Sequence, residues 1–183
     1  MSELTPPAQM WAKEQTQADQ DHHTPTAGAM TGHIVANLEV LSHKLMQASW
    51  YVTGLNRTAL RELFANQLQQ AQTQLFELGQ VLIDEGEMAP STAQEFADYS
   101  MLEEAGELKY ETAERIVDQL AHDYYTENLF VTRAIKLAEK EDRPVLAGYL
   151  TTLLGSNNHN IAELQAMLGR FGLAGLEEED DED

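Results

Sequence analysis

Four long stretches of this chain carry apolar residues at spacings of three and four, which places those residues on one face of an α-helix. The clearest of these stripes consists of Ile34, Leu38, Leu41, Leu45, Ala48 and Val52. Similar stripes run through residues 60–82, 113–138 and 146–168. Long helices with one apolar face each bury those faces by packing together, so the sequence predicts an all-α four-helix bundle. No strand pattern and no internal repeat competes with this prediction.

Capping and turn-forming residues predict where the first two long helices begin and end. The first should run from about Met30 to Gly54, because glycine adopts the left-handed conformation that stops a helix. Thr58 is expected to cap the second helix, because its hydroxyl can accept a hydrogen bond from a free backbone N–H. Gly86 is expected to end that second helix.

The connection between the second and third long helices is long enough to hold a helix of its own. Ser91 and Gln94 resemble a capping box, which predicts a short helix that ends near Tyr99. A loop over residues 101–106 should follow. One long crossover of this kind is a ferritin-like feature, whereas short loops throughout would give a simple up-and-down bundle.

The third long helix should run from about Tyr110 to Asp142. Its apolar stripe slips between Tyr124 and Val131, which predicts a local irregularity there. Pro144 suits the first position of the fourth helix, because its missing N–H needs no partner at that position.

The chain divides into three predicted segments. Residues 1–28 form an N-terminal arm, and residues 29–172 form the bundle, whose last helix ends at Gly169 or Gly172. Residues 173–183 are expected to form a disordered tail, because its end is a run of acidic residues.

The arm itself contains a predicted short helix over residues 7–13, capped by Thr5. The polar residues Gln15 to Gln20 are expected to fray. Trp11 is the large aromatic side chain of the arm, and solubility does not require it. We therefore expect this short helix to dock on another molecule.

The charge of the chain limits its partners. It has 31 acidic residues against 11 Lys and Arg, for a formal net charge of −20. Such a chain repels nucleic acid on average and attracts cations, although solubility alone also explains the charge. Because the chain has no cysteine, disulfides and thiolate metal sites are excluded, and a cytoplasmic protein is expected. No apolar run reaches the length of a membrane span, and no secretory signal is recognisable.

Several short motifs occur in an order and spacing similar to those of one known family. They are Trp50-Tyr51-Val52-x-Gly54, Pro90-Ser91-Thr92-x-x-Glu95-Phe96, His122-Asp123-Tyr124, Leu137-Ala138-Glu139 and Ala166-Met167-Leu168-Gly169. Over about residues 30–171 the chain resembles the Dps proteins, the DNA-binding proteins from starved cells within the ferritin-like group. The resemblance implies a short helix in the crossover between helices two and three of the bundle.

This resemblance also implies an assembly and an activity. Dps proteins form hollow shells of twelve subunits with tetrahedral symmetry. They oxidise ferrous iron with peroxide, which is a ferroxidase activity, and they store the ferric mineral inside the shell. Many members bind DNA and protect it during starvation, so the expected location is the cytoplasm, on the nucleoid where DNA is bound.

The family's iron-oxidising site lies between two subunits and uses two histidines, an aspartate and a glutamate. The equivalent positions in this chain are Ser49, Arg61, Phe76 and Gln80. Arg61 is a permanent cation that repels Fe(II), and Phe76 offers no ligand atom. Glu62 and Glu77 are each one residue away, but a shift of one residue turns a side chain by about 100° around the helix. We expect the usual site to be lost, so that any iron binds elsewhere.

Two other groups of residues are candidate metal sites. Glu139, Glu141 and Asp142 are expected near a threefold axis of the shell, where they could attract cations to a pore. A solvated helix end is the alternative, and Arg143 weakens the pore interpretation. The adjacent His22-His23 pair in the arm could bind zinc or iron, or could simply be solvated.

DNA binding depends on the arm. Trp11 and Lys13 are the candidate DNA-binding residues, and Lys13 is the only Lys or Arg in residues 1–28. Twelve copies on one shell would add avidity to weak contacts, and Mg²⁺ could bridge acidic residues to phosphate. Alternatively, Trp11 packs on a neighbouring subunit.

Three hypotheses therefore remain: a DNA-protecting shell without the usual ferroxidase site, an iron-storing shell with a non-standard site, and a structural partner that assembles with an active paralogue.

Overall fold

The structure is a computed structural model that describes residues 6–21 and 25–177. Over this part of the chain it contains helices, turns and loops, but no strand. The elements are α1 (Pro7–Asp21), α2 (Ala27–Tyr51), α3 (Arg57–Asp84), α4 (Ala93–Tyr99), the 3₁₀ helix η1 (Gly106–Tyr110), α5 (Ala113–Lys140) and α6 (Pro144–Met167). The predicted order of long, long, short, long and long helices is thus confirmed, with α1 preceding it.

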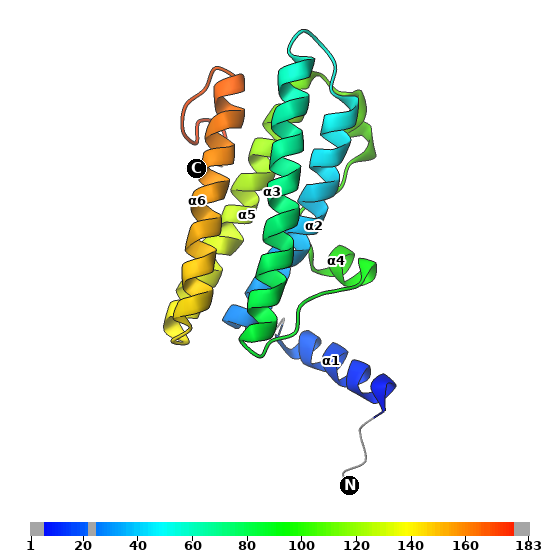
Figure 1. The fold of residues 1–183 in the computed structure, drawn as a ribbon, viewed down its shortest axis with the longest axis vertical. Helices are drawn as coiled ribbons and strands as arrows, with labels where there is room; N and C mark the ends of the chain where they lie inside the picture. The colour runs from blue at the N-terminus through cyan, green and yellow to red at the C-terminus, as the bar shows by residue number, and fades with distance from the viewer. Residues whose placement is uncertain (1–5, 22–24, 178–183) are drawn as a thin grey trace, which may run out of the picture.

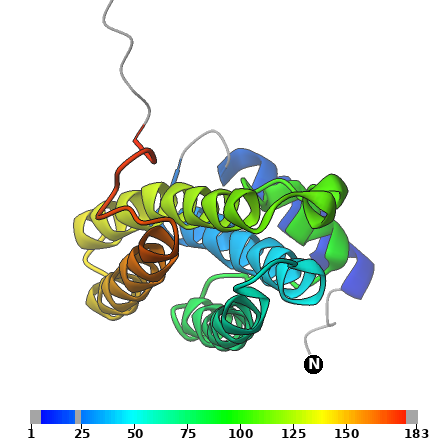
Figure 2. The ribbon, with the colours of Figure 1, turned by 90° about the horizontal axis from the view of Figure 1, so that it is seen from above.

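The helices α2, α3, α5 and α6 form the predicted four-helix bundle (Figures 1 and 2). The helix α2 packs against both α3 and α5, and α5 packs against α6. The predicted stripes make the core. For example, Ile34, Leu38 and Leu41 of α2 are completely buried, as are Leu120 of α5 and Leu150 of α6.

The crossover from α3 to α5 carries α4, which lies beside α2 (Figure 1). Its capping box is one residue later than predicted. The Thr92 hydroxyl accepts a hydrogen bond from the Glu95 N–H at 3.2 Å, and the Glu95 carboxylate accepts one from the Thr92 N–H at 2.9 Å. Gln94, which we expected to complete the box with Ser91, instead bonds to Asp98. Both positions 91 and 92 carry hydroxyls, so the sequence could not decide between them.

Two other predicted helix starts are wrong. The helix α2 begins at Ala27 rather than near Met30, because the Thr26 hydroxyl caps it. The helix α3 begins at Arg57 after Asn56, so Thr58 lies inside the helix. The predicted ends are better. Gly54 and Gly86 have φ values of +100° and +83°, the left-handed conformation that glycine favours.

The third and fourth long helices also differ in detail from the prediction. The helix α5 begins at Ala113 after Thr112, whereas Tyr110 belongs to η1. It is continuous where its apolar stripe slips, so the expected irregularity is wrong. Glu127 and Asn128 occupy the gap and are both buried. The stripe slips because polar residues enter the core there.

Two segments near the ends of the described residues are more ordered than predicted. The helix α1 includes Gln15 to Gln20, which we expected to fray, and it extends away from one end of the bundle (Figure 1). Thr5, its expected cap, lies outside the described residues. At the other end, α6 stops before Gly169, and Gln165 donates to the carbonyls of Gly172 and Ala174.

The predicted disordered tail is wrong for residues 173–177, because Leu176 is buried against the bundle. Residues 178–183 lie outside the described residues.

Candidate functional site

The four positions equivalent to the expected iron ligands fall into two pairs, one at the turn between α2 and α3 and the other toward the far end of α3. Ser49, half-buried near the end of α2, and exposed Arg61, near the start of α3, lie on either side of the turn at Gly54. Phe76 and Gln80 lie one turn apart and exposed, further along α3. Arg61 and Phe76 are separated by 15 residues of helix, which corresponds to about 22 Å. One chain therefore cannot bring the two halves together.

The contacts of Glu77 test whether it could take the place of Phe76 if the alignment were shifted by one residue. The Glu77 carboxylate accepts a hydrogen bond of 2.9 Å from the Tyr149 hydroxyl of α6 in the same chain. Phe76, in contrast, is 76% exposed. Gln80 donates to the Asp84 carboxylate at 2.8 Å on its own helix. Glu77 thus faces another helix of its own bundle and does not replace Phe76 on the exposed face.

The described side chains form no other group that could hold a metal. Among them, no three histidine, aspartate or glutamate side chains gather closely enough to bind a metal ion. His22 and His23, the candidate pair in the arm, lie outside the described residues.

The expected pore residues lie at the end of α5, where contacts within the chain engage one of them. Glu139 and Asp142 are exposed. Glu141 accepts a hydrogen bond of 2.8 Å from the backbone N–H of Ala27, so it helps to cap α2. Arg143 forms ion pairs with Glu85 at 3.6 Å and Glu87 at 2.6 Å. The pore therefore remains a prediction that rests mainly on Glu139 and Asp142.

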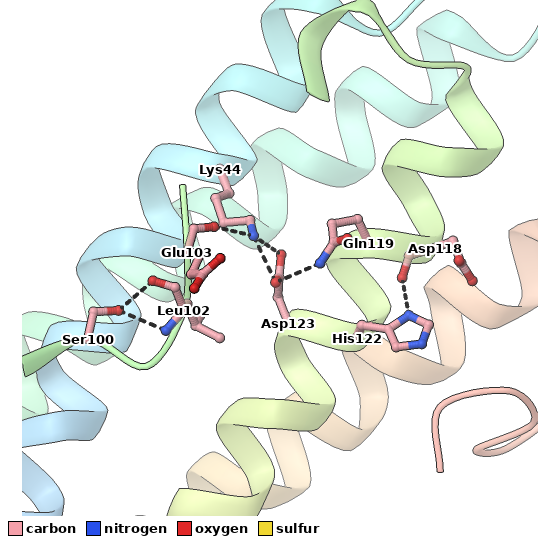
Figure 3. Close-up of polar contacts among 8 residues, drawn as sticks. All are labelled: Lys44, Ser100, Leu102, Glu103, Asp118, Gln119, His122 and Asp123. Atoms are coloured by element: carbon pink, nitrogen blue, oxygen red, sulfur yellow. Dashed lines mark hydrogen bonds and ion pairs between the residues drawn. The ribbon is translucent and has the colours of Figure 1, made fainter. Parts of the chain in front are cut away.

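A buried ion pair fixes the crossover to the bundle (Figure 3). Lys44 of α2 and Asp123 of α5 are both about 5% exposed, and their charged atoms lie 2.8 Å apart. Lys44 also donates to the Glu103 carbonyl of the crossover at 2.8 Å. Burial raises the pKa of Asp123, and this effect outweighs the opposing influence of Lys44 and the hydrogen bond from Gln119.

The rest of the predicted His122-Asp123-Tyr124 motif is also structural (Figure 3). The His122 ring contacts the Asp118 carbonyl of its own helix through Nδ1 at 2.9 Å. The Asp118 carboxylate in turn forms an ion pair of 2.6 Å with Arg170, beyond the end of α6. His122 and Asp123 thus contact groups of α5 and α2, and among the described residues they join no group of metal-binding side chains.

Two buried residues were not predicted to be important. Lys44 lies three residues after Leu41, within the apolar stripe. A lysine at such a position could have indicated a buried charge. Glu127 is completely buried and accepts a hydrogen bond of 2.6 Å from Asn37. Burial raises the pKa of Glu127 to about 8, against the opposing effect of Asn37. The slip in the apolar stripe of α5 could have indicated this buried glutamate.

The candidate DNA-binding residues lie on α1. Trp11 is 39% exposed, Met10 is 60% exposed, and Lys13 is also exposed. A groove of about 1020 Å³ separates α1 from the start of α2, the loop after α3, and α4. Burial, and secondarily the Glu95 carboxylate of α4, raise the pKa of Glu14. Met10 and Lys13 are among the residues that line this groove, whereas Trp11 is not.

Comparisons with known proteins agree with this architecture. Residues 31–174 match the model of the ferritin-like domain. The crystal structure of the Lactococcus lactis MG1363 DpsB protein has a TM-score of 0.85 and 36% sequence identity, covering 91% of this chain and 96% of that one. The chain belongs to the Dps family of ferritin-like proteins. The DpsA protein of the same organism is also similar, with a TM-score of 0.85, 31% identity, and coverage of 91% and 98%.

More distant Dps relatives match a shorter part of the chain. A curated relative from Listeria innocua, named DNA protection during starvation protein, is 28% identical over 141 residues. That match covers 77% of this chain and 90% of the relative. The lactococcal Dps structures cover more of this chain, so its similarity to them extends beyond the bundle core. Within the described residues, no helix combines the length and the apolar content that a membrane crossing needs.

Proposed function

We propose that this protein is a DNA-binding and DNA-protecting shell that acts in iron-related stress defence without the usual ferroxidase site. The observation that carries the proposal is α1, which leaves the bundle and exposes Trp11, Met10 and Lys13 to solvent. Names of relatives that refer to DNA protection during starvation support the same proposal. Its location would then be the cytoplasm, on the nucleoid.

The shell is an essential part of this proposal because a single α1 is a weak DNA ligand. Lys13 is its one cation, against Glu14, Asp19 and Asp21. One phosphate contact for each copy gives little affinity. A dodecamer of tetrahedral symmetry would present twelve copies, and simultaneous contacts raise the overall affinity without any new interaction. Mg²⁺ between acidic residues and phosphates would reduce the repulsion from the net charge of −20.

Our proposal that the ferroxidase site is lost rests on the chemistry of four side chains. Fe(II) prefers imidazole and carboxylate ligands, and none of the four equivalent positions carries either. Phe76 supplies no ligand atom, and Arg61 adds a positive charge that opposes a cation. We therefore expect this shell to bind and oxidise Fe(II) poorly at the interface where the family's site lies.

A gel-shift experiment at low salt tests DNA binding. The full chain should retard DNA, and a variant lacking residues 1–25 should not. This deletion keeps Thr26, so the cap of α2 remains. Gel filtration of both proteins should give the same assembly, which separates DNA binding from shell formation. Equal retardation by the two proteins would assign binding to another surface, and unretarded DNA with both would overturn the proposal.

The second candidate function is an iron-storing shell with a non-standard site, and the net charge of −20 favours it. Aerobic Fe(II) uptake should be measured with and without peroxide, using an inert acidic protein for comparison. Uptake faster than that of the comparison protein would support this second function. Uptake that appears only after assembly with a paralogue would identify the chain as a structural partner.

A further inference from the structure

All sulfur in this chain belongs to methionine, because the sequence contains seven methionines and no cysteine. Two of these methionines stand out by their exposure. Met88 is 64% exposed and Met10 is 60% exposed, and the next among the described residues is Met101, at 48%. Met30, in contrast, is only 6% exposed. Met10 and Met88 are therefore the thioethers that a small molecule in solution reaches most easily.

These two side chains come from separate elements and line the same groove. Met10 belongs to α1, and Met88 belongs to the loop between α3 and α4. Both are among the residues that line the groove of about 1020 Å³ between α1 and the bundle. Met101 and Met167, which are also exposed, do not line it. We call Met10 and Met88 the methionine pair.

The methionine pair shares the groove with other apolar side chains of the bundle. Ala29, Ala89 and Pro90 also line it. Apolar surfaces on two sides of a groove attract each other in water, because their approach removes them from solvent. Methionine suits an irregular surface of this kind, since its side chain is flexible and polarisable. The methionine pair thus favours a position of α1 close to the bundle.

Charge acts in the opposite direction. Lys13 is the one cation that lines the groove, against the carboxylates of Glu14, Glu87 and Glu95. Burial, and secondarily the Glu95 carboxylate, raise the pKa of Glu14, because both disfavour its ionised form. The position of α1 is therefore a balance between apolar attraction and carboxylate repulsion. A change in the polarity of the methionine pair shifts that balance.

Hydrogen peroxide produces such a change by one reaction with a thioether. A sulfur lone pair attacks one peroxide oxygen, and the O–O bond breaks. The proton on the transferred oxygen passes to the departing hydroxide, so the products are one sulfoxide and one water. Sulfur loses two electrons and the peroxide gains them. The reaction converts a flexible apolar side chain into a polar one.

We propose that Met10 and Met88 are a peroxide-responsive modification site, and that their oxidation to sulfoxides weakens the contact of α1 with the bundle. The apolar attraction across the groove decreases, while the repulsion between Glu14 and Glu95 stays. The reaction uses neither iron nor DNA, so it goes beyond the function proposed above and does not depend on it. Methionine sulfoxide reductases reverse the reaction, with one enzyme for each sulfoxide epimer.

Peptide mass spectrometry of the full chain, after brief treatment with hydrogen peroxide, tests the modification site. Each sulfoxide adds about 16 Da to the peptide that carries it. Met10 and Met88 should gain this mass at lower peroxide concentrations than Met30, because they are far more exposed. If Met30 is oxidised as readily as the methionine pair, the proposal is wrong.

Trypsin cleavage then reports how firmly α1 is held. Lys13 is the only Lys or Arg in residues 1–28, and it lies on α1 and lines the groove. Trypsin should release residues 1–13 faster from the oxidised protein, because a loosely held helix opens more easily. Treatment with both methionine sulfoxide reductases should restore the slower rate. An unchanged rate after complete oxidation of Met10 and Met88 would overturn the proposal.

Variants assign the effect to the methionine pair. Met10→Leu/Met88→Leu keeps apolar side chains of similar size that cannot form sulfoxides, so peroxide should not accelerate its cleavage after Lys13. The matched control Met101→Leu/Met167→Leu removes two exposed methionines outside the groove and should respond to peroxide as the unmodified protein does. If peroxide accelerates cleavage of the first variant equally, another group is responsible and the assignment is wrong. The reductase experiment decides the case even if a variant does not fold.

Discussion

At the scale of single residues, Lys44 and Asp123 form a buried ion pair between α2 and α5. Replacing Lys44 with Met removes the partner of a buried carboxylate, so we expect a loss of about 3–5 kcal/mol of stability. The double variant Lys44→Met/Asp123→Leu should recover much of this loss, because no uncompensated charge stays buried. Thermal and denaturant unfolding measure both effects. A double variant as unstable as the single one would mean that Lys44 acts mainly through the Glu103 carbonyl.

Glu127 should make folding stability depend on pH in a different way from most carboxylates. Its pKa in the folded protein, about 8, is above the ordinary value of 4.5. The folded state therefore binds the proton more tightly than the unfolded state does. The resulting stability is complete below pH 4.5, declines as the pH rises toward 8, and is absent above that. The loss is at most about 5 kcal/mol per chain.

The variant Glu127→Gln isolates this effect. Glutamine keeps an oxygen that can accept from Asn37 but does not ionise. Thermal unfolding between pH 5 and pH 9 should show a smaller decline for the variant than for the unmodified protein. Other residues that titrate in this range remain in both proteins, so the difference between the curves reports Glu127. Parallel curves would show that Glu127 ionises at its ordinary pKa.

At the scale of elements, the sequence was sufficient for the helices and insufficient for their exact starts. The stripes identified α2, α3, α5 and α6 because burial of an apolar face follows directly from spacing. The start of α4 depended on which of the adjacent residues Ser91 and Thr92 caps it, and spacing does not decide that. The slip in α5 was visible, but its meaning was not. A gap in a stripe looks alike whether the helix deforms or a polar residue enters the core.

The site was less predictable than the fold for a related reason. That Ser49, Arg61, Phe76 and Gln80 stand at the family's ligand positions stays a prediction from the resemblance. The contacts of Lys44 and Glu127 could not be predicted, because each partner is at least 59 residues away along the chain. Long-range polar contacts depend on the tertiary fold, which no local pattern encodes.

The helix α1 gives a prediction about charge. Gln15 is exposed on α1 and, unlike Lys13, does not line the groove, so Gln15→Lys should add a second cation to α1 outside the groove. Retardation of DNA should then occur at lower protein concentration. It should also depend more strongly on salt, by about 0.9 in the log–log slope for each added phosphate contact. The control Glu163→Gln changes the net charge by the same one unit on α6. An equal effect from both variants would assign binding to total charge and not to α1.

At the scale of the whole molecule, the separation between Arg61 and Phe76 requires two chains for any site of the Dps type. About 22 Å of helix lies between them, so each site must combine the first pair from one chain with the second pair from another. This arrangement can be tested by restoring the ligands. The variant Ser49→His/Arg61→His carries one half of a site, and Phe76→Asp/Gln80→Glu carries the other half.

Neither half-variant should oxidise Fe(II) with peroxide faster than the unmodified protein, because each interface then holds two ligands of one type. Co-expression of the two should produce mixed shells in which some interfaces hold all four ligands, and oxidation should appear. The variant with all four substitutions is the positive control. If it oxidises iron while the mixed shells do not, the two halves meet in some other way than across an interface of two chains. If neither oxidises iron, these four positions do not correspond to the family site, because imidazole and carboxylate groups brought together there would otherwise bind Fe(II).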